Sequence, residues 1–340
     1  MNCGIIGVGK MGISHCSILG AHPDVKKISI CDSSKFLLSA FEKHSNFKCY
    51  TDYKQMIKEG DLDFIVIATP TKLHFDMVKF SLENNCHVFC EKPFVLEIKD
   101  GIELNKIALD NNLVNQIGYH NRFIGTFQAV KKYIDSNLIG EICHIKGEAY
   151  GPVVVKEETD TWRSNPKEGG GCLFDYASHV INLMQYMVED PLEVSGTILK
   201  KIYSKNVEDA VYSSMFYKNG ITGHLSVNWS EETYRKMSTK IEIFGKKGKI
   251  ISDAQECQLY LKEDSKESDF IKGWNGVWLT DQTKPVLFNL RGEEYSDQLD
   301  YFITCIKEKR IQNINSFEES LKTDKTIEML RQDYEDKFNG

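Results

Sequence analysis

The chain has 340 residues, which suits two domains of about 100–200 residues each or one large domain. Its net charge is −7 and neither Lys nor Arg forms a long run, which argues against a nucleic-acid partner, because such a protein carries a basic face. No stretch approaches the ~18 consecutive apolar residues of a membrane helix, and the 10 cysteines lack paired metal-ligand spacing, so we predict no membrane insertion, no metal site and a reducing, cytoplasmic location.

Short apolar strands alternate with helices over the first third of the chain. The predicted strands are 2–6, 27–31, 48–50, 64–68, 87–90 and 114–118. The predicted helices between them are 11–19, 35–43, 53–58, 73–84 and 98–111. Strands that are apolar on both faces are typical of a parallel sheet with helices on both sides. We therefore predict an α/β domain with a doubly wound parallel sheet over residues 1–121.

After residue 121 the strands become longer and alternate polar with apolar residues. Helices are predicted at 126–136, 173–187, 296–309 and 318–335, and strands at 142–150, 194–201, 210–217, 221–229 and 240–244. Turn signals between the later strands favour antiparallel hairpins, whereas residues 263–294 show no assignable pattern. We predict that residues 122–340 form an α+β domain on a mostly antiparallel, open-faced sheet.

A glycine turn follows the first predicted strand and opens the first helix. Gly7-Val8-Gly9-Lys10-Met11-Gly12 fits the G-x-G-x-x-G pattern of dinucleotide-binding folds. The first glycine permits a tight turn, the second lets a pyrophosphate approach the backbone, and the third lets the helix pack against the strand. We expect Gly7, Gly9, Lys10, Met11 and Gly12 to bind the pyrophosphate at the helix N-terminus.

Asp32 ends the second predicted strand, twenty positions past Gly12. A carboxylate there accepts hydrogen bonds from a ribose 2′-hydroxyl and repels a 2′-phosphate. The alternative is that Asp32 only caps the next helix. Because Ser33 follows it and no arginine is near, the pattern favours NAD, although Lys35 leaves NADP open. The Rossmann-type turn and Asp32 together predict an NAD site.

Three further motifs lie where a cofactor and substrate would meet in such a fold. They are Ala68-Thr69-Pro70 with His74, Glu91-Lys92-Pro93, and Gly169-Gly170-Gly171-Cys172-Leu173-Phe174-Asp175-Tyr176-Ala177-Ser178-His179. With the glycine turn, and with Arg122-Phe123, residues 138–142 and Trp162-Arg163 between them, these motifs resemble the glucose–fructose oxidoreductase / inositol dehydrogenase / MocA family over nearly the whole chain.

The resemblance implies catalytic roles for Lys92, Asp175 and His179. Oxidation of a secondary alcohol needs a base for the hydroxyl proton, and an imidazole suits that task near neutral pH. Asp175 and His179 are four residues apart on a predicted helix, so both project from one face. Lys92 ends a parallel strand, where its ammonium group can stabilise alkoxide character. The alternatives without a catalytic role are that Lys92 is a solvated surface lysine and that Asp175 and His179 form a surface or capping pair.

The resemblance also marks residues around the cofactor and substrate. Thr69, Pro70, Glu91 and Lys92 are expected to border the cofactor, and His74 either contacts it or caps a helix. For the substrate we expect Asn121, Trp162, Arg163 and Asn182. The alternative for Trp162 is that its large side chain anchors the core. Asn182 stands where family members often carry Asp, which would alter charge recognition at that position.

The predicted function is an NAD-dependent dehydrogenase or reductase acting on a CH–OH group of a sugar, cyclitol or nucleotide-linked sugar, with His179 as proton acceptor. One alternative is a glycoside hydrolase that keeps its NAD and oxidises the sugar only transiently. A second is a noncatalytic dinucleotide sensor. Because the open sheet face would otherwise expose apolar residues, we also predict a homodimer or homotetramer.

Overall fold

The chain forms two compact units. The structure is a computed structural model that describes residues 1–157, 161–266, 268–282, 285–286, 288–290 and 292–338. One unit comprises Met1–His120 with Pro285–Leu321, and the other comprises Asn121–Lys284 with Lys322–Gly340. Compared with the predicted division after residue 121, this one places Asn121 in the second unit and Pro285–Leu321, which includes α9 (Glu293–Lys307), in the first. That helix returns to the first unit because its buried Leu299, Phe302 and Ile303 belong to that unit's core.

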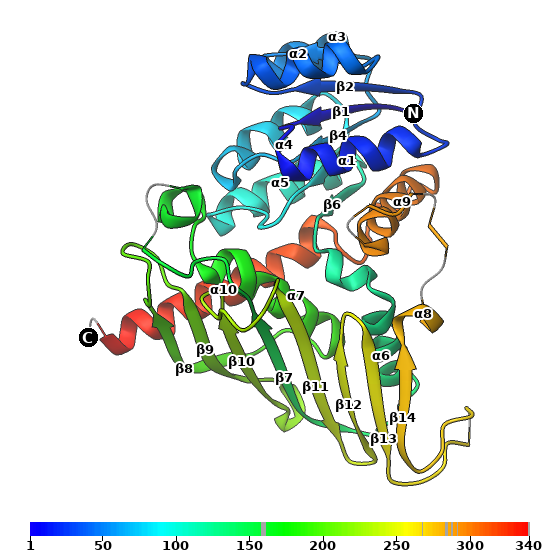
Figure 1. Ribbon diagram of the computed structural model, residues 1–340, viewed down its shortest axis with the longest axis vertical. Helices are drawn as coiled ribbons and strands as arrows, with labels where there is room; N and C mark the ends of the chain where they lie inside the picture. The colour runs from blue at the N-terminus through cyan, green and yellow to red at the C-terminus, as the bar shows by residue number, and fades with distance from the viewer. Residues whose placement is uncertain (158–160, 267, 283–284, 287, 291, 339–340) are drawn as a thin grey trace. The chain divides into compact units, whose positions relative to one another are not determined.

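The first unit is built on a six-stranded parallel sheet with the strand order β3-β2-β1-β4-β5-β6 (Figure 1). Its strands are β1 (Asn2–Ile6), β2 (Lys27–Cys31), β3 (Lys48–Tyr50), β4 (Phe64–Ile67), β5 (His87–Cys90) and β6 (Asn115–Ile117). The helices between them are α1 (Lys10–Ala21), α2 (Lys35–His44), α3 (Tyr53–Glu59), α4 (His74–Glu83) and α5 (Ile98–Asp110). The predicted doubly wound parallel sheet is confirmed.

Strand β4 shows why these strands are apolar throughout. Phe64 and Val66 belong to one hydrophobic cluster of the first unit, whereas Ile65 and Ile67 belong to the other. Successive side chains of a strand point to opposite faces, so both faces of the sheet are buried. The strand order reverses between β1 and β4, and in such sheets ligands bind at the carboxyl ends of the strands at that point.

The second unit is built on an eight-stranded sheet with the order β14-β13-β12-β11-β7-β10-β9-β8. The strands are β7 (Ile142–Tyr150), β8 (Glu193–Lys200), β9 (Ala210–Phe216), β10 (Thr222–Asn228), β11 (Ser238–Gly245), β12 (Gly248–Asp253), β13 (Glu256–Leu261) and β14 (Gly273–Trp278). Among the described strands of this sheet, only β7 and β10 pair in parallel. The predicted mostly antiparallel sheet is therefore confirmed, and residues 263–294 contribute β14 and α8 (Leu279–Gln282).

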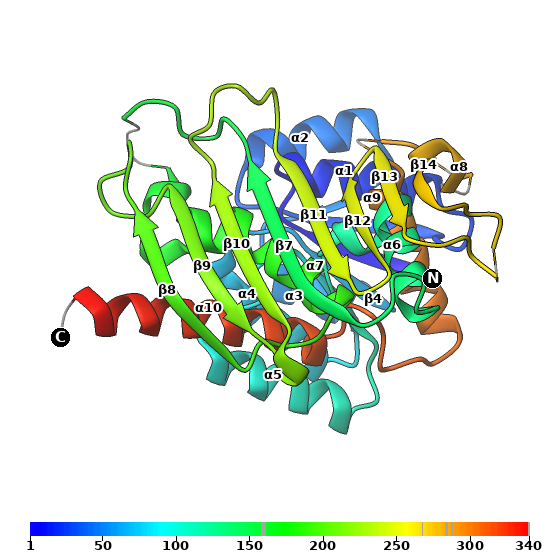
Figure 2. The same ribbon diagram turned by 90° about the horizontal axis from the view of Figure 1, so that it is seen from below.

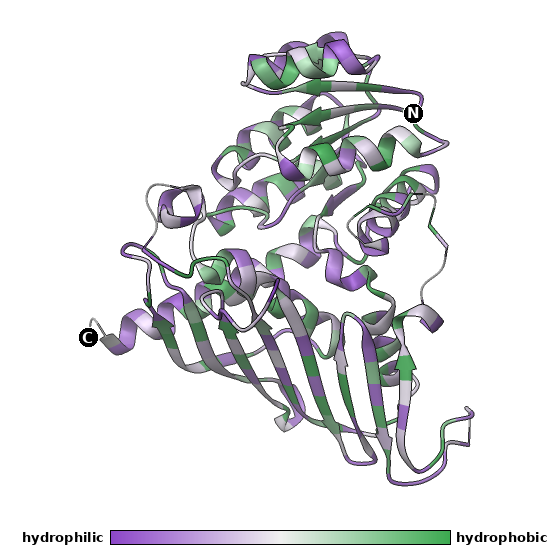
Figure 3. Cartoon of the chain, in the orientation of Figure 1, coloured by the Kyte–Doolittle hydropathy of each residue, from purple (hydrophilic) through white to green (hydrophobic). Residues whose placement is uncertain are grey.

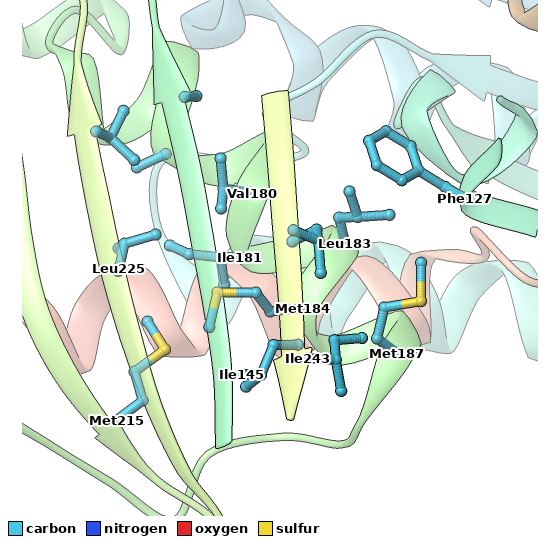
Figure 4. Close-up of a cluster of buried hydrophobic side chains, with 14 of the residues drawn as sticks. Phe127, Ile145, Val180, Ile181, Leu183, Met184, Met187, Met215, Leu225 and Ile243 are labelled. Carbon is cyan, nitrogen blue, oxygen red and sulfur yellow. The ribbon is translucent and has the colours of Figure 1, made fainter. Parts of the chain in front are cut away.

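Helices α6 (Gly125–Asp135), α7 (Ser178–Met187) and α10 (Phe317–Phe338) lie on one face of the large sheet, and Figure 2 shows the other face without helices. The strands alternate hydrophilic and hydrophobic residues accordingly (Figure 3). In Figure 4, Val180, Ile181 and Met184 of α7 point at strand residues Ile145 and Leu225, all of them buried. This packing fixes the rotation of α7 about its axis.

The helices and cysteines of the structure can be compared with the expectations of no membrane insertion, reduced thiols and no metal site. Within the described ranges, no helix combines the length and the apolar character that a membrane span requires. All ten cysteines lie in those ranges, and each carries a free thiol. The described side chains also contain no group of three or more His, Cys, Asp or Glu residues placed to hold a metal ion.

Candidate active site

The glycine turn joins β1 to α1 with the geometry that the sequence pattern predicts. Gly7 has a φ of 87°, which favours glycine. A Cβ at Gly12 would lie 1.8 Å from the Gly7 carbonyl oxygen, so only glycine lets the helix pack this closely. A Cβ at Gly9 would meet nothing within 4 Å, and no side chain caps the first turn of α1. The helix N-terminus therefore presents N–H groups and open space, which fits a pyrophosphate.

Asp32 lies directly after β2 and next to this turn. Its Oδ2 accepts the Val8 N–H at 2.8 Å and its Oδ1 accepts the Ser34 N–H at 2.8 Å. The cap of α2 is Ser34, whose hydroxyl accepts the Leu37 N–H. A carboxylate has about four acceptor sites, so two remain for hydroxyl groups. Asp32 is thus oriented by the turn itself, which fits a ribose diol beside the pyrophosphate.

The other predicted cofactor residues gather around the same strand ends of the first unit. Lys10, Ser33 and Pro70 are exposed, and Met11, Thr69, Glu91 and Lys92 are half-buried. Because they follow β1, β2, β4 and β5, whose carboxyl ends share one edge of the parallel sheet, they are placed together by topology. Their contacts with a cofactor remain predictions.

His74 differs from these exposed and half-buried residues because its side chain has no exposed surface. Its Nε2 lies 3.0 Å from the Thr69 carbonyl oxygen, and its Nδ1 lies 3.0 Å from that of Pro93 and 3.2 Å from that of Phe94. Burial lowers the pKa of His74, although these carbonyl contacts oppose the shift. The ring ties the loop after β4 to the segment that follows Lys92, so it supports the loops that border the predicted cofactor site.

In the second unit, Asp175 and His179 lie on one helical run. Asp175 belongs to a π-helical turn, Leu173–Ala177, which continues directly into α7, where His179 is buried. Such turns are frequent at functional sites because the extra residue shifts side chains around the helix. The predicted helix over 173–187 is confirmed, while its π-helical start has no signal in the sequence.

Arg163 holds the Asp175 carboxylate. Its Nε donates to Asp175 Oδ2 at 3.2 Å, and its guanidinium lies 4.5 Å from the centre of the Trp162 ring. The side chain of Asp175 is 12% exposed and that of Arg163 39% exposed. Both partners come from the motifs that the sequence analysis singled out, and the structure brings Trp162, Arg163 and Asp175 together. The half-buried carboxylate remains accessible to a ligand hydroxyl.

Two acidic residues before β9 anchor this region, and neither was among the predicted site residues. Glu208 Oε1 accepts the Leu173 N–H at 2.8 Å, at the start of the π-helical turn. Asp209 is fully buried and accepts the Trp229 Nε1–H at 2.7 Å. The only signal of this anchoring role in the sequence is that two acidic residues stand side by side before a predicted strand. The helix that carries Asp175 and His179 therefore begins on a fixed scaffold.

Asn121 and Asn182 are both buried in the second unit, with 3% and 1% of their surfaces exposed. The Asn182 Oδ1 accepts a hydrogen bond from Arg122 Nε at 2.7 Å, and its Nδ2 donates to Thr323 Oγ1 at 3.1 Å. Asn182 therefore links α7 to Arg122 and to α10. The substrate contacts expected for Asn121 and Asn182 stay predictions.

Two family models match this chain. Residues 1–119 match the oxidoreductase family with an NAD-binding Rossmann fold, and residues 127–251 match the GFO/IDH/MocA C-terminal domain. The chain belongs to the Gfo/Idh/MocA family. It is therefore an NAD-binding oxidoreductase, as the glycine turn and the motifs around Lys92 and His179 predict.

Relatives and solved structures of the family resemble the chain over most of its length. Levoglucosan dehydrogenase of Pseudarthrobacter phenanthrenivorans is 26% identical over 74% of this chain and 73% of its own. Myo-inositol 2-dehydrogenase of Thermotoga maritima is 23% identical over 74% of this chain and 75% of its own. A solved levoglucosan dehydrogenase complex with NADH and levoglucosan superimposes with a TM-score of 0.88 at 21% identity, covering 98% of this chain and 96% of that one.

Proposed function

We propose that this family member transfers a hydride between NAD and a secondary hydroxyl or keto carbon of a sugar, cyclitol or nucleotide-linked sugar. The observation that carries the proposal is the buried imidazole of His179, four residues after the Asp175 carboxylate that Arg163 holds. The printed names of two relatives, levoglucosan dehydrogenase and myo-inositol 2-dehydrogenase, support a cyclic polyol as substrate class.

Each catalytic side chain has a role in the oxidation direction. His179 accepts the proton of the substrate hydroxyl as its oxygen becomes a carbonyl oxygen. Asp175 accepts a hydrogen bond from a neighbouring substrate hydroxyl, and Arg163 keeps its carboxylate in place. The ammonium group of Lys92 donates to the reacting oxygen while negative charge develops on it. The glycine turn and Asp32 would hold NAD, whose nicotinamide would supply the hydride acceptor.

An absorbance screen tests the proposal directly. The purified protein is mixed with NAD⁺ and a panel of cyclitols, free sugars and nucleotide-linked sugars, and the reduced-nicotinamide band is followed. We expect the band to rise with at least one cyclic polyol. Cleavage of a glycoside with no net rise would support the NAD-retaining hydrolase instead, and NAD binding without any turnover would support the sensor.

Asp32 should determine the choice between NAD and NADP. We expect Asp32→Asn to lower the ratio of NAD to NADP affinity about 10–100-fold, since a hydrogen bond to a charged group contributes about 1.5–3 kcal/mol and the repulsion of a 2′-phosphate is lost. Titration of nicotinamide fluorescence with NADH and NADPH measures both affinities. Asp110→Asn, at the exposed end of α5, serves as the control and should leave the ratio unchanged. An unchanged ratio in Asp32→Asn would contradict the assignment.

The uncovered face of the large sheet supports the predicted homodimer or homotetramer. Phe244, Trp274 and Trp278 are 38%, 57% and 56% exposed. On this face Lys146 pairs with Glu148, and Glu242 pairs with both Lys240 and Lys249. Alternating charges of this kind let a second copy place lysine against glutamate across a two-fold axis. We infer that a second copy of the chain covers this face.

Sedimentation equilibrium tests the assembly. We expect the wild-type protein to sediment as a dimer or tetramer at micromolar concentration, and Trp274→Asp to shift it toward the monomer because a charge would be buried in the interface. NADH binding should be unchanged in this variant. A wild-type monomer at micromolar concentration would contradict the inference.

The thiols support the cytoplasmic location that we infer for the protein. None of the ten cysteines is in a disulfide. Burial raises the pKa of Cys16, Cys31 and Cys257 to about 12. Since the thiolate is the reactive form, these cysteines are inert core residues, which is typical of proteins that fold in a reducing compartment.

A further inference from the structure

A buried histidine–glutamate pair lies beside Lys92 in the first unit. His15, on α1 three residues after Gly12, has no exposed surface, and its Nε2 lies 2.7 Å from Glu91 Oε1. Its ring also packs edge-on against Phe89 of β5, with ring centres 5.3 Å apart. Glu91 directly precedes Lys92. The pair therefore links the helix that follows the glycine turn to the strand end that carries Lys92.

The Glu91 carboxylate is enclosed and charged. A Cβ at Gly118, directly after β6, would lie 3.0 Å from Glu91 Oε2, so glycine leaves the space that the carboxylate fills. Burial raises the pKa of Glu91, but the hydrogen bond and charge of His15, together with the charges of Lys92 and His120, outweigh burial and lower the pKa. Although its side chain is only 13% exposed, Glu91 is thus an anion at neutral pH.

We propose that His15 and Glu91 act as one unit that fixes the Lys92 ammonium group toward the reacting oxygen, which makes both of them positioning residues. The Glu91 anion is the neighbour of Lys92 in the chain, so it attracts the ammonium group and restricts where that group can lie. His15 supplies the hydrogen bond that keeps the enclosed carboxylate charged. The inference rests on the proposed function of Lys92.

Loss of either partner should have the same consequence. Glu91→Gln removes the negative charge directly. His15→Phe keeps an aromatic ring against Phe89 but removes the hydrogen bond that orients the carboxylate and opposes the effect of burial. Either change leaves Lys92 without an oriented anionic neighbour. A second loss can therefore add little, and the two substitutions should be strongly non-additive.

The experiment uses two measurements on Glu91→Gln, His15→Phe and the double variant. The first is the rate at which an amine-reactive anhydride labels Lys92 without NAD or sugar, followed by mass spectrometry of its peptide. We expect labelling to be severalfold faster in all three variants, because a side chain that the carboxylate no longer restricts meets the reagent more often. The second is steady-state turnover, where we expect kcat to fall about tenfold in each variant.

The opposite end of α1 offers a matched control. His22 Nε2 lies 3.0 Å from Asp300 Oδ1, and neither residue belongs to the Glu91-Lys92-Pro93 motif. His22→Phe and Asp300→Asn should change neither Lys92 labelling nor kcat. If His15→Phe does not fold, Glu91→Gln decides alone through its labelling rate. Unchanged labelling in Glu91→Gln, or effects of the two substitutions that simply multiply, would overturn the inference. Absence of turnover in the wild-type protein would overturn the proposed function instead, and the labelling result would still stand.

Discussion

His179→Ala is expected to bind NADH normally and to lose turnover by roughly 10²–10⁴-fold, the usual cost of removing a general base. The loss should fall on kcat, because the base acts on the substrate proton and not on the cofactor. His179 is 4% exposed, so its removal leaves a small cavity beside the helix that carries it. Steady-state kinetics and NADH titration on the same preparation separate the two effects.

His44→Ala provides the matched histidine control, since His44 is exposed in the last turn of α2. Its turnover should equal that of the wild type. A thermal unfolding curve for His179→Ala establishes that the variant is folded. Full activity in a folded His179→Ala protein would show that another group accepts the proton.

Asp209→Asn is expected to destabilise the second unit by about 2–4 kcal/mol, since it leaves buried donors without their acceptor. The Oδ2 atom accepts the N–H groups of Ile202, Tyr203 and Ser204 at 2.6, 2.7 and 2.8 Å. The Oδ1 atom accepts the Ser204 hydroxyl at 2.6 Å and the indole N–H of buried Trp229 at 2.7 Å. Urea unfolding followed by tryptophan fluorescence measures the loss, and all 4 tryptophans lie in this unit.

The stability lost in Asp209→Asn should be larger at neutral pH than at acidic pH. Burial raises the pKa of Asp209, but hydrogen bonds from Ser204, Trp229 and the backbone outweigh burial and lower it below the ordinary value. A lowered folded-state pKa stabilises the fold above the unfolded value of about 3.9, and this contribution disappears as pH falls through the folded-state pKa. The difference between the wild type and Asp209→Asn should therefore be full at neutral pH and shrink below about pH 4.

Asp135→Asn is the control for Asp209→Asn, because the Asp135 carboxylate is 58% exposed and pairs with Lys131 on the surface of α6. Its effect should stay below about 1 kcal/mol. An equal loss in both variants, or a loss in Asp209→Asn that is the same at neutral and acidic pH, would contradict the role of the buried carboxylate.

The first unit could be predicted closely because its signals are local. Strands 27–31, 48–50 and 87–90 have the same bounds in the structure as in the prediction, since an apolar strand between two helices is determined by its own residues. The glycine turn and Asp32 likewise lie within one strand–turn–helix unit. By contrast, α9 belongs to the first unit through contacts such as that of Asp300 with His22, 278 residues earlier, and no local pattern encodes that choice.

The site shows the same division between local and long-range information. Spacing alone places Asp175 and His179 on one helical run, whereas the π-helical start of that run depends on how Glu208 meets the N–H of Leu173. A lone histidine in an apolar helix gives no sign that His15 reaches Glu91, 76 residues away. Asn182 is a polar residue at a motif position, yet its side-chain amide forms hydrogen bonds with Arg122 and Thr323 of the same unit.

Transfer of a carbon-bound deuterium tests the central claim most directly. The protein is incubated with NAD⁺ and deuterated myo-inositol, levoglucosan or other members of the substrate panel, and the cofactor is then analysed by mass spectrometry. We expect NADH that carries one deuterium, formed in equal amount to the oxidised polyol. Conversion of a substrate while the cofactor pool ends oxidised and free of deuterium would contradict a net dehydrogenase and would indicate redox-neutral chemistry.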